Sequence, residues 1–464
     1  MKRCYRRNVN SVFFFIGFVL LLSGDVFAAE DLKKRIDEIV EPYLENDVVV
    51  GMSIGILHDG ATTVAGYGRL SKKKERKPDA DTVYEIGSIS KVFTGVLLAD
   101  AVERGHVKLD QPAGELLPEN VKMPARGERP ISLQDLSTHV SGLPRMPSNF
   151  KPKDRNNPYA DYSVDQLYAF INDHKLRREP GEKSEYSNLA QGLLGHLLAT
   201  KQKTTYEELL AERIANPLGM KSTSITLSDD QKSRLAPPHT TDGEPASNWD
   251  IPTLAGAGAI RSTVNDMLKF TQANLDSPKN ELGKAIDLAW KVHQKPLRSG
   301  EFSMGLGWHL ARDGSTRWHN GQTGGYHSMM LVNRQMSAGV VVLANSATGE
   351  IDALAQDIIR LIAGQDVKPR TFEKTIEITD AELQKYVGEY QLLPGIAFTV
   401  TANDGKLMVK LTGQQAFRVY PRSKTEWFYK VVKATITFEF DDEGKCESLV
   451  LFQNGIKQKA RKVE

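Results

Sequence analysis

Ser88 and Lys91 lie three residues apart, and together they could form an activated nucleophile. Residues at this spacing share a face of a helix, so the Lys91 ammonium group can reach the Ser88 hydroxyl. A helix N-terminus also stabilises developing negative charge. The apolar helix pattern that follows comprises Val92, Phe93, Val96, Leu97, Ala101 and Val102. This arrangement predicts a serine nucleophile at the start of a buried helix.

The same serine–lysine spacing occurs twice more, in contexts that favour loops. Ser71 and Lys74 lie in a strongly charged run, and Ser148 and Lys151 lie between two prolines. Neither pair is followed by an apolar helix face that would hold the lysine in place. We therefore expect Ser88 to be the copy that carries chemistry.

A tyrosine and an asparagine form a second motif, Tyr186-Ser-Asn188. The apolar helix pattern over residues 189–199 follows directly, so Tyr186 is predicted at a loop-to-helix junction, where its side chain could enter a cleft. Taken alone, the motif favours a packed tyrosine beside an N-capping asparagine.

A third motif, His319-Asn-Gly321, is predicted at the end of a strand and is followed by Gln322. Glycine in a strand often marks a close approach of another backbone or of a ligand. His58 begins a second segment of the form H-x-G, but it lies in a predicted hairpin turn and is expected to be solvated. The third motif is therefore the better candidate to border a cleft.

The surrounding elements alternate in a way that predicts an α+β fold. A hairpin over residues 48–67 opens the domain, and strands return much later in the chain. Between them the pattern is mostly helical, so we expect an antiparallel sheet flanked by helices, a helical lobe and a cleft between the two. The predicted helices span residues 32–40, 164–174, 189–199, 206–214, 264–275 and 351–362, and the later strands span 305–311, 316–319, 325–332 and 338–344.

Composition divides the chain further. Residues 1–28 have the basic, apolar and small-residue parts of a cleavable secretory signal, which predicts a periplasmic or secreted protein; an uncleaved anchor is the alternative. The first domain is assigned to residues 29–364 and a linker to 365–372. The second domain is assigned to residues 373–464. About eight short strands with tight-turn signals are predicted in it between Tyr386 and Val463, which indicates a small antiparallel β-barrel.

Charge and cysteine content exclude several classes of protein. The formal net charge of the 464 residues is +2, which gives no indication of a nucleic-acid partner. Cys4 would leave with the signal, so Cys446 alone would remain, and neither an intrachain disulfide nor a cysteine metal cluster could form. His309, His319 and His327 lack the spacing of a ligand set, and His309 and His327 are expected to be packed or surface residues. No metal or cofactor is expected.

One motif suggests a different hydrolase fold. Gly51-Met-Ser53-Ile-Gly55 fits the G-x-S-x-G pattern of a nucleophile elbow. Such an elbow needs a strand, a sharp turn and then a helix. Here the predicted strand continues to Leu57, so Ser53 is expected to be an ordinary strand residue.

The three motifs, in this order, resemble the class C β-lactamase and DD-peptidase superfamily of penicillin-binding serine hydrolases. The resemblance extends over about residues 31–364 and includes segments 136–144, 217–220 and 262–267. It implies the β-lactamase/transpeptidase-like fold. The C-terminal barrel resembles the lipocalin-like domain that follows some peptidase members.

This resemblance implies a role for each matched residue. Ser88 would form an acyl-enzyme, Lys91 would hold it, and Tyr186 would shuttle its proton. Asn188 would bind the substrate's side amide and steady Lys91. The backbone N–H groups of Ser88 and Gln322 would form an oxyanion hole. His319 and Asn320 would stand where β-lactamases carry the lysine and threonine of Lys-Thr-Gly, and Gly321 would complete the substrate-binding strand.

The third motif also shapes the substrate expectation. A neutral histidine supplies less fixed positive charge than lysine, which argues against efficient β-lactam hydrolysis. A DD-peptidase or D-amino-acid peptidase is the preferred prediction, with a β-lactamase or carboxylesterase as alternatives and a non-turnover penicillin-binding receptor as one of another class. Substrates would be D-amino-acid peptides, β-lactams or esters, with the cell wall as a candidate partner. The barrel would cap the cleft, bind the wall or mediate oligomers, and the oligomeric state stays open.

Overall fold

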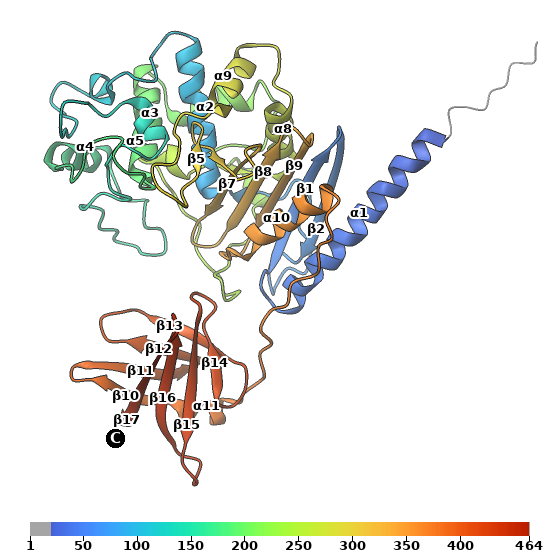
Figure 1. The fold of residues 1–464 in the computed structure, drawn as a ribbon, viewed down its shortest axis with the longest axis vertical. Helices are drawn as coiled ribbons and strands as arrows, with labels where there is room; N and C mark the ends of the chain where they lie inside the picture. Colours follow the sequence, from blue (N-terminus) through green and yellow to red (C-terminus); the bar gives the residue numbers. More distant parts are fainter. Residues whose placement is uncertain (1–19, 464) are drawn as a thin grey trace, which may run out of the picture.

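The computed structural model describes residues 20–463, with side chains from residue 31 onward. Figure 1 shows a larger N-terminal body of helices around a sheet, and a separate β-barrel at the C-terminal end. The predicted signal over residues 1–28 lies largely outside the described residues. Helix α1 (Leu20–Glu45) begins within it. Among the helices of the described part, none has both the length and the apolar character needed to cross a membrane.

A seven-stranded antiparallel sheet forms the centre of the larger body, in the order β2-β1-β9-β8-β7-β6-β5. The first hairpin therefore joins the late strands, as predicted, with β1 paired to both β2 and β9. The strands are β1 (Gly51–His58), β2 (Ala61–Gly68), β5 (Ser303–Met304), β6 (His309–Leu310), β7 (Thr316–Gln322), β8 (His327–Asn333) and β9 (Ala338–Ala344).

Helices cover both faces of the sheet. One face packs on α1 and α10 (Glu350–Ile362), and the alternate residues Met52, Ile54 and Ile56 of β1 belong to that core. The other face packs on α8 (Val264–Leu275) and α2 (Ser90–Glu103). Because successive strand residues point to opposite faces, a sheet with apolar residues on both sides can be covered in this way.

The helical lobe surrounds α2, which is buried on every side from Ser90 to Ala101. A helix that is apolar all round is typical of a core position, and here it fixes the start of the helix where Ser88 lies. The other helices are α3 (Leu133–Ser137), α4 (Val164–Asp173), α5 (Asn188–Lys201), α6 (Tyr206–Leu210), α7 (Asp229–Arg234) and α9 (Glu281–Trp290). Strands β3 (Tyr84–Glu85) and β4 (Arg261–Ser262) form a separate two-stranded pair.

Three local predictions differ from the structure. Only β6 (His309–Leu310) falls within the strand predicted over residues 305–311, because the chain turns there between β5 and β6 and Gly307 adopts a φ of 72°. The helix predicted over residues 206–214 is α6 followed by a π turn at Ala211–Ala215. His319 lies inside β7 and not at a strand end.

The C-terminal domain is a closed barrel of eight antiparallel strands, which confirms the predicted small β-barrel. Its aromatic core includes Tyr390, Trp427 and Phe438, and the buried Cys446 lies on a strand beside Tyr390. A short helix, α11 (Asp380–Leu383), precedes the barrel. The strands are β10 (Gly388–Leu393), β11 (Ile396–Asn403), β12 (Lys406–Leu411), β13 (Ala416–Pro421), β14 (Glu426–Phe428), β15 (Ala434–Phe440), β16 (Cys446–Gln453) and β17 (Ile456–Val463).

Candidate active site

The predicted nucleophile lies in a single 3-10 turn (Gly87–Ile89) that leads directly into α2. The Lys91 ammonium Nζ donates a hydrogen bond of 2.7 Å to the Ser88 hydroxyl and another of 2.6 Å to the carbonyl oxygen of Ala257. The Lys91 side chain is completely buried, and no carboxylate of the described residues pairs with it. Burial, and secondarily the charge of Arg145, hold the pKa of Lys91 well below its usual value.

Tyr186 lies immediately before α5 and faces the same point. Its ring centroid is 4.9 Å from Lys91 Nζ and 5.0 Å from the guanidinium carbon of Arg145. Burial raises the pKa of Tyr186 to about 12, although a hydrogen bond with Ser88 and the Arg145 charge act in the opposite direction. The hydroxyl is therefore protonated at neutral pH. The N-cap of α5 is Ser187, whose Oγ accepts a hydrogen bond from Ala190, and not an asparagine.

Asn188 lines the cleft, but it does not contact Lys91 as expected. Its amide Nδ2 lies 3.3 Å from the Tyr159 hydroxyl and 3.8 Å from the sulfur of Met146. The amide oxygen Oδ1 is buried and has no hydrogen-bond partner among the described residues. A buried carbonyl oxygen without a partner costs free energy, and an incoming N–H group could satisfy it.

Strand β7 approaches the nucleophile closely, and Gly321 makes this approach feasible. A Cβ atom at this position would lie 2.0 Å from the Ile86 carbonyl oxygen and 2.8 Å from the Ser88 nitrogen. Any side chain would push the strand away. Gly87, with a φ of 49°, supplies the matching turn on the other side.

The register of the β7–β8 hairpin determines where the Gln322 N–H points. Thr323 donates a hydrogen bond of 3.1 Å to Tyr326, so these two residues form a hydrogen-bonded pair. Antiparallel pairs alternate, so the next pair, Gln322 with His327, is not hydrogen-bonded. The Gln322 N–H therefore points away from β8, towards the edge of β7 where Ser88 lies. Two backbone donors can thus face one reacting oxygen.

His319 is buried on the cleft side of β7, with its ring centroid 6.3 Å from that of Tyr186. Its Nε2 has no hydrogen-bond partner in the described part of the chain. Burial, followed by the nearby His309 and Lys91, holds the pKa of His319 well below its usual value, so the ring is neutral at pH 7. This position therefore supplies a polar atom but no fixed charge.

The neighbouring polar side chains of β7 point to the other face. Asn320 Nδ2 donates a hydrogen bond of 2.6 Å to Asp352 on α10. The Gln322 amide oxygen lies 3.1 Å from His327 Nδ1, and His327 Nε2 lies 2.8 Å from Asp352. Asn320 and Gln322 therefore border the cleft through their backbone more than through free side chains.

Several residues that the sequence analysis missed also line the site. His309 was expected to be packed or exposed, yet it lies at the cleft, with its ring 4.5 Å from Trp318 and 4.9 Å from His319. Burial lowers its pKa to about 4. His139 is buried behind the lining residues and packs in a tilted arrangement against Tyr186, with ring centroids 4.5 Å apart. No spacing pattern links these histidines in the sequence, because strand pairing and loop packing bring them together.

These groups surround one cleft of about 580 Å³. No group of three His, Cys, Asp or Glu side chains among the described residues has an arrangement suited to a metal ion. The lining residues are Gly87, Ser88, Arg145, Met146, Tyr159, Tyr186, Asn188, Trp249, Ile251, Ala257, Gly258, His309, Asn320, Gly321, Gln322, Thr323 and His327.

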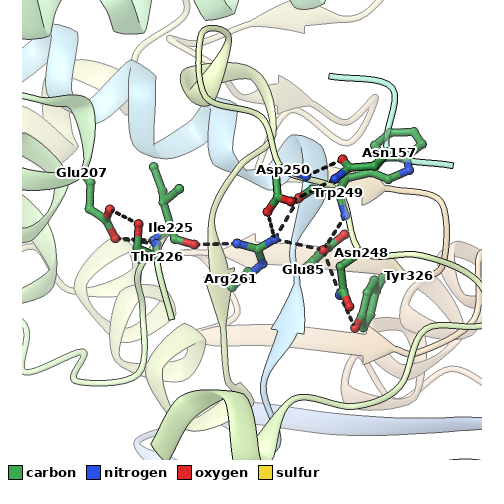
Figure 2. Close-up of polar contacts among 10 residues, drawn as sticks. All are labelled: Glu85, Asn157, Glu207, Ile225, Thr226, Asn248, Trp249, Asp250, Arg261 and Tyr326. Carbon is green, nitrogen blue, oxygen red and sulfur yellow. Dashed lines mark hydrogen bonds and ion pairs between the residues drawn. The ribbon is translucent and has the colours of Figure 1, made fainter. Parts of the chain in front are cut away.

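A buried ion pair ties the rim of the cleft to the strand before Ser88 (Figure 2). The Arg261 guanidinium lies 3.4 Å from Glu85 and 3.0 Å from Asp250, and it donates to the Trp249 carbonyl oxygen at 2.9 Å. Glu85 also accepts from the Trp249 N–H at 2.9 Å. Asn157 forms hydrogen bonds with Asp250, which connects the loop around residue 157 to the network. The contacts of Arg261 and Glu85 with the Trp249 backbone thereby fix the position of this residue, which lines the cleft.

The competing motif is buried elsewhere. Ser53 lies within β1, and its hydroxyl donates to the Asp79 carbonyl oxygen at 2.8 Å and lies 2.9 Å from the Tyr84 hydroxyl. No turn into a helix follows it, so the nucleophile-elbow interpretation is wrong. His58 is at the hairpin turn, part-exposed, as expected.

Comparison with known proteins agrees with this geometry. The β-lactamase family model matches residues 36–364, and a model described as a domain of unknown function, DUF3471, matches residues 373–462. A β-lactamase of Pseudomonas fluorescens is 26% identical over 351 residues, which cover 68% of this chain and 94% of that protein. The D-alanyl-D-alanine-carboxypeptidase/endopeptidase AmpH of Escherichia coli K12 is 29% identical over 296 residues, covering 58% and 75%.

Solved structures show the same relationship. The crystal structure of a β-lactamase/D-alanine carboxypeptidase from Yersinia pestis, complexed with citrate, matches with a TM-score of 0.65 at 25% identity and covers 72% of this chain and 99% of that chain. A class C β-lactamase, at 24% identity and a TM-score of 0.63, shares the fold. The family match covers most of the chain and includes the nucleophile, the tyrosine and the β7 strand. The chain belongs to the β-lactamase family of serine hydrolases.

Proposed function

We propose that this protein is an exported amide hydrolase that forms an acyl-enzyme on Ser88 and cleaves D-amino-acid peptides, as a DD-peptidase does. The observation that carries the proposal is the 2.7 Å hydrogen bond between Ser88 and a completely buried Lys91. A lysine whose pKa is depressed by burial can be neutral, and a neutral amine can accept the serine proton.

The first chemical step follows from this pair. Lys91 Nζ takes the Ser88 proton, and the serine oxygen attacks the carbonyl carbon of the substrate. Negative charge develops on the carbonyl oxygen, where the N–H groups of Ser88 and Gln322 would receive it. Fixed backbone donors stabilise such charge without reorganising during the reaction.

Tyr186 would act mainly as a proton donor. A tyrosine with a pKa of about 12 is a poor resting base at neutral pH, but its hydroxyl can pass a proton to the leaving nitrogen and recover one through Ser88 and Lys91. The family resemblance implied instead that Tyr186 itself takes the serine proton and passes it on. The reason for the difference is that burial raises the pKa of Tyr186 more than the Ser88 hydrogen bond and the Arg145 charge lower it.

Three observations favour peptides over β-lactams as the substrates. The third motif carries a neutral histidine where β-lactamases carry lysine. The unpartnered Asn188 oxygen could accept an N–H from a substrate amide. Among the similar proteins, AmpH is named as a carboxypeptidase/endopeptidase, and the Yersinia pestis structure as a β-lactamase/D-alanine carboxypeptidase.

Export by the segment over residues 1–28 is part of the same proposal. Cleavage after Ala28 would leave the part of α1 that packs on the sheet through Ile36, Ile39 and Val40. Mass spectrometry of the protein recovered from periplasm or medium tests it. A mature chain that begins at Ala29 supports export, and an intact N-terminus on cell-associated protein contradicts it.

The central experiment is intact-mass spectrometry after exposure to a fluorescent penicillin, together with hydrolysis of a D-Ala-D-Ala peptide, nitrocefin and a short nitrophenyl ester. We expect a lasting adduct and peptide turnover, both lost in Ser88→Ala and both kept in Ser53→Ala, the matched buried-serine control. Rapid nitrocefin turnover with a transient adduct would indicate a β-lactamase. Ester turnover alone would indicate an esterase, and an adduct without any turnover would indicate a penicillin-binding receptor.

A further inference from the structure

Arg145 is the one permanently charged side chain among the residues that line the cleft, and no acidic residue lines it in the described part of the chain. Its side chain is exposed to the cleft and rests against the Tyr186 ring. The cleft therefore presents a positive charge to whatever enters.

This arginine lines the cleft without a carboxylate partner, unlike two arginines near it. Arg129 pairs with Asp135 at 2.9 Å, and Arg178 pairs with Glu185, on the same lobe. Within residues 31–463, no Asp or Glu side chain lies within ion-pairing distance of Arg145. A guanidinium group is a planar fork of donors that matches a carboxylate with two parallel hydrogen bonds.

The backbone of Arg145 is fixed beside the substrate-binding asparagine. Its carbonyl oxygen accepts hydrogen bonds from the N–H groups of Asn188 and Leu189, at 3.1 and 3.2 Å, at the start of α5. These hydrogen bonds fix the backbone of Arg145 next to Asn188. If Asn188 receives the amide of the substrate's acyl portion, Arg145 lies beside that same portion.

On the sheet side of the cleft, two histidines lie near Tyr186 or line the cavity, and a third, His327, is paired with Asp352. His319 and His309 on the sheet are held neutral by burial, so neither supplies a fixed charge that could attract an anion. A carboxylate entering the cleft would be drawn to Arg145.

We propose that Arg145 is a specificity residue that binds a carboxylate on the acyl side of the substrate, next to Asn188. The protein would thus select peptides that carry an acidic group on the amino side of the bond that is cleaved. This inference rests on the proposed acyl-enzyme function, but it concerns selectivity and not the chemistry itself.

The test uses two peptides that differ only in that charge: glutaryl-D-Ala-D-Ala and its glutaramide counterpart. We expect the native enzyme to prefer the glutaryl peptide in kcat/KM. Arg145→Gln should lower kcat/KM for that peptide by about 10- to 100-fold, mainly through KM, because charge-assisted hydrogen bonds have this strength. The preference should collapse towards unity, and Arg145→Lys should restore part of it.

The control variant is Arg155→Gln, which removes an exposed charge from the same loop region and does not touch the cleft. It should keep the native preference. If Arg145→Gln lowers kcat/KM equally for both peptides, the residue acts through Tyr186 or Lys91, and the carboxylate assignment is wrong.

A binding measurement separates this inference from the proposed function. In the Ser88→Ala background, calorimetry should show tighter binding of the glutaryl peptide and loss of that difference when Arg145→Gln is added. If the enzyme turns over both peptides without preference and binds them equally, only the carboxylate assignment fails. If the native enzyme forms no adduct and turns over neither peptide, the proposed function fails.

Discussion

The two walls of the cleft differ in how they hold charge. The helical wall carries the Arg145 charge and the buried amine of Lys91, at 5.0 and 4.9 Å from the Tyr186 ring centroid. The sheet wall carries backbone donors and the neutral rings of His319 and His309. This difference indicates that the two walls have different roles. The helical wall would transfer protons, and the sheet wall would help to hold the reacting carbonyl oxygen.

The largest effect is expected from the proton-transfer wall. Tyr186→Phe removes only the hydroxyl and should lower the rate of peptide hydrolysis by about 10²–10⁴-fold, the usual range for a general acid–base group. Single-turnover kinetics would locate the loss in acylation. Tyr159→Phe, which removes another cleft hydroxyl, is the matched control and should cost much less. Equal losses in the two variants would contradict the assignment.

A smaller effect is expected from the sheet wall through Gly321→Ala. The added Cβ would meet the Ile86 carbonyl and the Ser88 nitrogen, so β7 must shift away and the Gln322 N–H would leave its position. Misplacing one such donor should cost about 10²–10³-fold in kcat. Circular dichroism should still show a folded protein. A variant that folds and keeps full kcat would mean that the Gln322 donor is not used.

Because the buried histidines of the sheet wall are neutral, we expect the stability of the protein to depend on pH. The pKa of buried His309 is about 4, against about 6.5 in an unfolded chain, so the unfolded state binds the proton first as the pH falls. The stability gained by burying the neutral ring is complete above about pH 6.5 and is lost as the pH falls towards 4.

His309→Gln should remove part of this loss. The fall in Tm between pH 7 and pH 4.5 should be about 2–4 °C smaller than in the native protein, whereas His106→Gln, at an exposed histidine, should leave the fall unchanged. The opposite sign, with a larger fall in His309→Gln, would mean that the ring is charged in the folded state and that the sheet wall is cationic.

The smallest effect is expected where the barrel contacts the loop that forms the rim. The Tyr420 hydroxyl donates to Asp242, and Lys406 lies 2.8 Å from Glu244. These contacts are part-exposed, so Tyr420→Phe with Lys406→Gln should cost about 1 kcal/mol or less in stability and leave kcat within about threefold. Thermal melting and peptide kinetics measure both quantities. A large loss of kcat would mean that the contacts between the barrel and the rim loop contribute to catalysis.

Much of the fold was predictable because its signals are local. The hairpin at Gly51–Gly68, helix α8 and strand β9 follow from apolar periodicity and turn residues. The two-residue strands β5 and β6 were missed as such, since a strand of that length is defined by its partner and not by its own sequence. The barrel was recognisable from short alternating strands separated by turns with Asn-Asp-Gly or Asn-Gly.

The candidate site was predictable only in part. Ser88, Lys91 and Tyr186 belong to short motifs that can be recognised in the sequence, and the structure brings them together. Asn188 was placed correctly at the cleft but not against Lys91, because that lysine finds the Ala257 carbonyl oxygen instead. Arg145 directly follows segment 136–144, which was already matched to the family. Its place next to that segment could have predicted that it lies near the cleft.

The sequence by itself determined the order of the three motifs, the helix that carries the nucleophile and the alternation that divides the chain into an α+β body and a β-barrel. These depend on residues close together along the chain. Only the tertiary structure decided that His139 packs against Tyr186, that His309 lies at the cleft, that the Gln322 N–H faces Ser88 and that Arg145 has no acidic partner. Strand register and long-range packing set these distances, and burial in turn sets the protonation of each group.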